Sequence, residues 1–156
     1  MGYTHYWTQS ANFTEDEWDY VRAFFTKMRE LLPQHRTTAW DNDEVPELFG
    51  WDGIGSPEMS AVAVGFNGDK SKEINHETFR VEKRLNEDSW QFCKTARKPY
   101  DVAVNAMLLM FSTMTPTTFT LATDGTNTIH GEEWDGGRKL FCATYRALYD
   151  EGIYLP

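Results

Sequence analysis

Residues 92–113 read FCKTARKPYDVAVNAMLLMFST, and this stretch decides how the chain is expected to fold. Pro99 is favoured in the first turn of a helix, because the backbone N–H that it lacks would have no partner there. The spacing of the apolar residues predicts a helix from Pro99 to about Thr113. These residues cover more than one side of the helix, which indicates a position at the centre of the fold.

Patterns of strand and helix alternate on both sides of this central segment. Thr14 and Glu17 have the spacing of a capping box, which predicts a helix over residues 15–32. A third helix is expected from about Asp135 to a stop at Gly152. Strand patterns lie at 3–8, 60–66, 78–83 and 117–122, with shorter strand pieces near 37–40 and 47–49.

The order of these elements predicts the α+β class. We expect a single domain over residues 1–156, built as a sandwich of a mainly antiparallel sheet with about three helices packed on it. A length of 156 residues suits one domain with a sizeable core. The hydrophobic content of 40%, with 15% aromatic residues, is typical of a folded globule.

The charge and the apolar runs exclude several kinds of partner. Asp and Glu number 24 against 15 Lys and Arg, so the net charge is −9. This argues against binding to a nucleic-acid backbone, which depends on distributed cations. The longest apolar run, residues 102–111, is too short to cross a bilayer, and the first residues lack a secretory pattern. The sequence therefore predicts a cytoplasmic protein with no nucleic-acid partner and no membrane partner.

Three cations stand out in this acidic chain, because Lys94, Arg97 and Lys98 fall within five residues. They precede the predicted central helix, whose free backbone N–H groups and positive dipole end favour an anion. Arg offers a planar fork to a phosphate or carboxylate, Lys a mobile charge, and Thr95 a neutral hydroxyl donor. The cluster predicts an anion site. The alternative is a solvated loop whose cations pair with nearby acidic residues.

The opening strand suggests where a flat ring could bind. Alternation in a strand places Tyr3, His5 and Trp7 on one face, where they could stack a purine and hydrogen-bond its edge. The alternative is an ordinary core strand with a hydrogen-bonded histidine. Tyr100 and Asp124 complete the predicted polar rim, although Tyr100 could instead close the helix end, and Asp124 could be a purely structural turn residue.

Signatures of catalysis are absent from the chain. It contains no metalloprotease helix motif, no nucleophile elbow, no Walker lysine loop and no dinucleotide glycine fingerprint. The four histidines show no ligand spacing, and the acidic stretches lack the spacing of a calcium loop. Cys93 and Cys142 give neither a disulfide framework nor a zinc motif. We therefore assign no catalytic residue, metal or cofactor from the sequence.

Four segments resemble a family of small, mainly uncharacterised proteins of bacteriophages and bacteria. They are the Gly-Tyr-Thr-His-Tyr-Trp opening at residues 2–7, the Phe-Asn-Gly-Asp turn at 66–69, the Glu-Thr-Phe strand at 77–79 and the block at 92–101. The resemblance spans nearly the whole chain, and the block at 92–101 is its most specific part. It implies a phage or bacterial cytoplasmic setting, in which some small phage proteins sequester the nucleotide signals of bacterial immune systems.

Together these patterns favour a binding protein that captures a small phosphorylated nucleotide-like ligand. Two alternatives stay open. One is a phosphoesterase or lyase in which His5 is the general base and Lys94 or Arg97 stabilises charge. The other is an acidic inhibitor that binds a basic host protein and could mimic DNA. The aromatic surplus is also compatible with a homo-oligomer that has an interfacial pocket.

Overall fold

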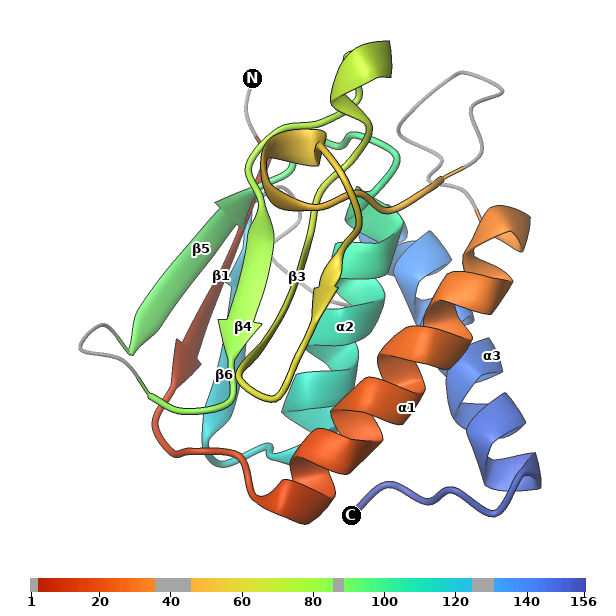
Figure 1. Ribbon diagram of the computed structural model, residues 1–156. Helices are drawn as coiled ribbons and strands as arrows, with labels where there is room; N and C mark the ends of the chain where they lie inside the picture. The colour runs from red at the N-terminus through yellow and green to blue at the C-terminus, as the bar shows by residue number, and fades with distance from the viewer. Residues whose placement is uncertain (1–2, 36–45, 86–88, 125–130) are drawn as a thin grey trace.

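The first sheet is centred on the opening strand. The computed structural model describes residues 3–35, 46–85, 89–124 and 131–156 of the chain (Figure 1). Strand β1 (Thr4–Gln9) lies between β5 (Trp90–Lys94) and β6 (Phe119–Thr123), and both pairings are antiparallel. The register places His5 opposite Cys93 on one side and opposite Thr123 on the other.

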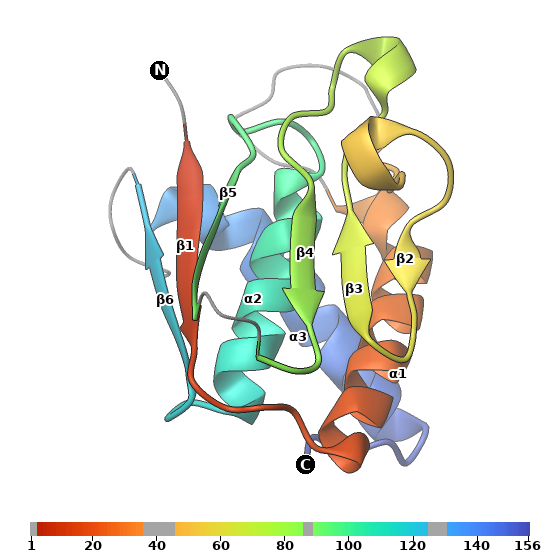
Figure 2. The ribbon, with the colours of Figure 1, turned by 60° about the vertical axis from the view of Figure 1, so that its left-hand side comes forward.

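A second antiparallel sheet continues the layer. It has the order β2 (Glu58–Met59), β3 (Ala63–Phe66), β4 (Phe79–Glu82). Figure 2 shows the strands of both sheets in one layer, with β4 beside β5 and the helices behind. Phe49 adds an isolated bridge to Asn67. The strand piece expected at residues 37–40 lies outside the described residues.

Three α-helices cover one face of this layer in the described part of the chain. They are α1 (Glu15–Leu31), α2 (Asp101–Met114) and α3 (Asp135–Asp150). The short 3-10 turns used below are η2 (Trp51–Gly53), η3 (Lys70–Lys72) and η4 (Glu132–Trp134). The capping box of α1 is confirmed, because the Thr14 hydroxyl accepts from the Glu17 N–H and the Glu17 carboxylate accepts from the Thr14 N–H.

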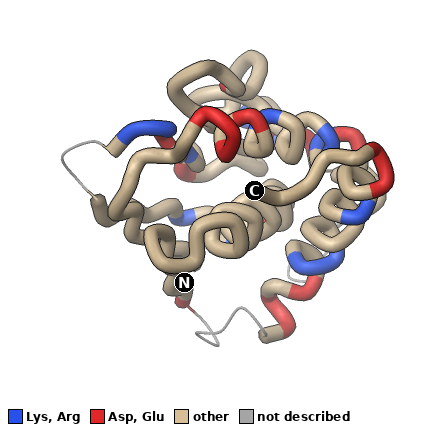
Figure 3. The backbone as a smooth tube through the Cα atoms, turned by 90° about the horizontal axis from the view of Figure 1, so that it is seen from below, with Lys and Arg blue, Asp and Glu red and all other residues tan. Residues whose placement is uncertain are grey.

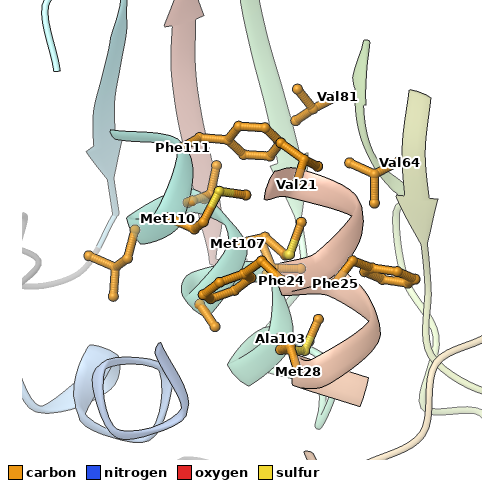
Figure 4. Close-up of a cluster of buried hydrophobic side chains, with 14 of the residues drawn as sticks. Val21, Phe24, Phe25, Met28, Val64, Val81, Ala103, Met107, Met110 and Phe111 are labelled. Carbon is orange, nitrogen blue, oxygen red and sulfur yellow. The ribbon is translucent and has the colours of Figure 1, made fainter. Parts of the chain in front are cut away.

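Helix α2 forms the centre of the core, as its apolar composition predicts. Only Ser112 and Thr113 of this helix are not buried. Figure 4 shows Phe24 and Phe25 of α1 close to Met107 of α2, with Val64 and Val81 contributed by β3 and β4. No helix in the described ranges has both the length and the apolar composition needed to cross a membrane.

The prediction of the α+β class is confirmed, although the described strands form two small sheets and not one. Helix α2 begins at Asp101 and not at Pro99, a difference within the usual uncertainty of helix ends. The expected strand over 60–66 is shorter, because the Ser60 hydroxyl accepts from the Ala63 N–H and closes a turn there. Strand β5 was not predicted, since its last residue, Lys94, was assigned to the basic cluster.

Candidate functional site

His5 lies at the centre of a buried polar network. Its Nε2 atom is 2.6 Å from Oδ1 of Asp101, and its Nδ1 atom is 2.9 Å from the Thr123 hydroxyl. The Asp101 carboxylate also accepts from the Thr95 hydroxyl at 2.5 Å and from the Asn105 amide at 3.2 Å. All five side chains are buried. Both ring nitrogens of His5 therefore have partners within the protein, and neither reaches solvent.

The other two aromatic residues predicted for the ligand face also point into the core. The Tyr3 ring meets His5 edge-on at 4.9 Å, and burial raises the pKa of Tyr3 to about 12. Trp7 packs 5.4 Å from Phe79, measured between ring centroids. This is the arrangement of the alternative interpretation, a core strand with a hydrogen-bonded histidine.

The turn after β5 separates the predicted cations. Arg97 lies over the Tyr3 ring at 4.3 Å and binds the Glu133 carboxylate at 2.7 Å. Lys98 donates to the Glu73 carbonyl at 3.3 Å. Ala96 and Arg97 have φ values of 51° and 57°, in the left-handed region that non-glycine residues rarely adopt. Thr95 turns inward to Asp101, so the cluster does not converge on one point.

The two predicted rim residues have partners of their own. The buried Tyr100 hydroxyl donates to the Glu77 carbonyl at 2.6 Å, and burial raises the pKa of Tyr100 far above its usual value. The Asp124 carboxylate accepts from the Thr4 N–H at 3.2 Å. Cys93 is buried as well, and this burial raises the pKa of its thiol, which makes it a poor nucleophile.

A groove of about 220 Å³ follows the boundary between the two sheets, where β4 lies beside β5 (Figure 2). Alternation along β4 buries Phe79 and Val81 in the core and leaves Arg80 and Glu82 at the groove. Phe92 of β5 lines the opposite side, and half of it is exposed. The remaining polar lining comes from Gln9, Thr78, Arg84 and Gln91.

Trp51 lines the same groove and is 67% exposed. It begins the η2 turn, in which Asp52 has a φ of 56° and donates its N–H to the Thr78 hydroxyl at 3.0 Å. Gly53 follows with a φ of 85°, and a Cβ atom there would lie 2.4 Å from the Gly68 carbonyl oxygen. The turn is thus tied to Thr78, the residue before β4, which fixes the Trp51 backbone beside the groove.

The groove carries both charged and aromatic side chains. Arg80 is paired with both Glu58 and Glu82, whereas no other described residue forms an ion pair with the exposed Arg84. Lys94 follows Phe92 by two positions on β5, so the two side chains leave the same face of the strand. On that face the Trp90 ring stacks on Tyr6 at 5.7 Å and meets Phe92 at 5.3 Å.

Sequence reasoning found only Trp7 among the residues that line this groove. The missed signal is the alternation of Trp90, Phe92 and Lys94 with Gln91 and Cys93, which is the pattern of a half-buried strand. Trp51 gives no comparable signal, because contacts with distant residues determine its position.

Neither a set of metal ligands in the described residues nor a similar protein indicates what the groove binds. Within the described ranges, no three His, Cys, Asp or Glu side chains come together as a set that could hold a metal ion. No protein-family model matches this chain, and comparisons with curated proteins and with solved structures find no similar protein. The resemblance of the 92–101 block to phage and bacterial proteins therefore stays a prediction.

Proposed function

We propose that the protein is a binding protein for a small phosphorylated nucleotide-like ligand, which it holds in the groove between β4 and β5. One observation carries the proposal: two exposed aromatic rings, Trp51 and Phe92, line the same groove as the guanidinium groups of Arg80 and Arg84. Aromatic rings stack on a base of any identity, and guanidinium groups match the geometry of phosphate oxygens.

The size of the groove limits how the ligand is held. Its volume of about 220 Å³ is below the roughly 300–1,000 Å³ that is usual for drug-sized ligands. It therefore encloses a single flat ring, and the charged part of the ligand lies at the surface. Arg84 is exposed beside the groove, and Lys94 extends from the same face of β5 as Phe92.

The protein is proposed to capture the ligand without catalysing a reaction on it. Neither histidine nor cysteine is among the residues that line the groove. His5, the general base of the enzyme alternative, has both ring nitrogens bonded inside the protein. Stoichiometric capture needs affinity and no activated nucleophile. It also fits the phage setting that the family resemblance implies, in which the ligand is a signalling nucleotide in the host cytoplasm.

In Figure 3, acidic and basic positions lie near one another on the same elements in the view from below. This interspersed arrangement of positions supports a small ligand over a basic protein partner, for which a continuous run of acidic positions would be more suitable.

Calorimetry against a panel of cyclic and linear nucleotides tests the proposal. We expect at least one of them to bind, and Trp51→Ala or Phe92→Ala to weaken it by about tenfold or more, since stacking contributes roughly 1–3 kcal/mol per base. Tyr154→Ala is the control, because Tyr154 is an exposed aromatic residue that does not line the groove. Chromatography after denaturation should return the ligand intact.

Absence of heat with every nucleotide would contradict the proposal. So would an affinity that Trp51→Ala and Phe92→Ala leave unchanged. Recovery of a cleaved nucleotide would support the phosphoesterase or lyase alternative in place of capture.

A further inference from the structure

We propose that a second, buried site, formed where β1, α2 and η4 meet, holds a neutral hydroxyl group the size of water or a small alcohol. It is separate from the groove and does not depend on the function proposed there. Four side chains at this junction each have a buried polar atom without a hydrogen-bond partner. These atoms are the Tyr3 hydroxyl, Asn105 Oδ1, Glu133 Oε2 and Trp134 Nε1.

The four residues belong to one cluster. The rings of Tyr3 and Trp134 both meet His5 edge-on, at centroid distances of 4.9 and 5.1 Å. The Asn105 amide donates to Asp101, the partner of His5, and reaches the Glu133 carbonyl at 3.4 Å. Each residue is therefore joined to the His5–Asp101 pair directly or through one neighbour.

The chemistry of these atoms defines what they can bind. The indole N–H of Trp134 and the hydroxyl of Tyr3 are donors, whereas Asn105 Oδ1 and Glu133 Oε2 are acceptors. Burial raises the pKa of Tyr3 to about 12, so its hydroxyl keeps its proton at neutral pH. An anion would meet the two acceptor oxygens. A hydroxyl group both donates and accepts, and it satisfies both kinds of atom.

Buried polar atoms are nearly always hydrogen-bonded, to protein or to ordered water. A lone atom without a partner would be a small exception. Four of them around one His–Asp pair, two donors and two acceptors, form a complementary set for a bound hydroxyl group. A buried water commonly makes about three hydrogen bonds to such atoms.

The ion pair between Arg97 and Glu133 lies at the edge of this buried site. Its two side chains are 31% and 23% exposed, whereas Tyr3, Asn105 and Trp134 are no more than 1% exposed. Arg97 also covers the Tyr3 ring at 4.3 Å. Because Tyr3, Asn105 and Trp134 are buried, we expect exchange of the bound group with solvent to be slow compared with surface hydration.

Nuclear magnetic resonance of the intact protein tests the site through its indole protons. We expect the Trp134 indole proton to show a cross-peak to a bound hydroxyl group or water, and a shift typical of a hydrogen-bonded indole. Trp18 is the matched control, because its buried indole donates to the Ser60 carbonyl at 2.9 Å and should show no such cross-peak. In Tyr3→Phe, which keeps the ring and removes one donor, the Trp134 cross-peak should fall at least twofold while Trp18 is unchanged.

Mass spectrometry of the denatured protein identifies the source of the hydroxyl group. If a small alcohol is released, the bound group is an organic ligand. If the cross-peak is present and no compound is released, the bound group is water. Either result supports the site. A Trp134 indole proton with the shift of an unbonded indole and no cross-peak in the wild-type protein would overturn it, whether or not Tyr3→Phe folds.

Discussion

The Nε2 atom of His5 lies 2.6 Å from Oδ1 of Asp101, and this contact joins the central strand of one sheet to the first residue of the central helix. Asp101 places its carboxylate at the positive end of the α2 dipole, where an anion is favoured. The sequence predicted an anion at this helix start. In the structure the chain supplies a carboxylate there itself, held by His5, Thr95 and Asn105.

Removal of that carboxylate should destabilise the fold strongly. Asp101→Ala leaves His5 and two other buried donors without their acceptor, and the loss of one partner of a buried pair costs about 3–5 kcal/mol. Urea unfolding followed by tryptophan fluorescence measures the change. Asp19→Ala, at an exposed position of α1, should stay within about 0.5 kcal/mol of the wild-type protein. Equal effects of the two substitutions would show that the network contributes little.

Alkaline pH should reduce stability through the buried tyrosines. Burial raises the pKa of Tyr3 and of Tyr20 to about 12 from an ordinary value of 10.0. The folded state then binds these protons more tightly than the unfolded state. Their contribution is complete below pH 10 and is lost as the pH rises from 10 through 12. The free energy of unfolding, measured across this range, should therefore fall.

The double variant Tyr3→Phe, Tyr20→Phe should show a shallower fall over the same pH range, because two of the titrating groups are gone. Tyr100, whose pKa burial also raises, remains in that variant and keeps part of the slope. An unchanged slope would mean that neither phenol titrates with a raised pKa.

The sequence revealed the elements whose signals are local. The capping box at Thr14 and Glu17 and the apolar run of α2 depend on residues within a few turns of one another, and both predictions are confirmed. The pairing of His5 with Asp101 spans 96 positions, so spacing cannot indicate it. The groove was missed for the same reason. Trp51 reaches it through a turn bonded to Thr78, and Phe92 belongs to a five-residue strand whose end resembled a charged loop.

The turn that carries Trp51 should be sensitive to a single methyl group. Gly53→Ala combines a left-handed backbone, with a φ of 85°, and a Cβ atom 2.4 Å from the Gly68 carbonyl oxygen. Gly55→Ala is the matched control, since its φ is 72° but nothing lies within 4 Å of its Cβ position. Left-handed strain of roughly 1–2 kcal/mol is common to both. Overpacking should add about 1–3 kcal/mol for Gly53→Ala alone, measured by urea unfolding. Similar losses in the two variants would contradict a tightly packed turn.

Two arginines distinguish the anion site proposed in the groove from the one predicted at the start of α2. Arg84 is exposed beside Trp51 and Phe92, and no other described residue forms an ion pair with it, whereas Arg97 is bound to Glu133 and covers Tyr3. We expect Arg84→Ala to lower the affinity for a nucleotide about tenfold and to leave the affinity for the matching nucleoside unchanged, because only the phosphate contact is lost.

Arg97→Ala should instead reduce stability by about 1 kcal/mol and leave nucleotide affinity unchanged. Calorimetry at two salt concentrations measures the nucleotide affinity of both variants, and urea unfolding measures their stability. Arg146→Ala, on the exposed face of α3, is the control. If Arg97→Ala removes nucleotide binding and Arg84→Ala does not, the ligand lies at the start of α2 and not in the groove.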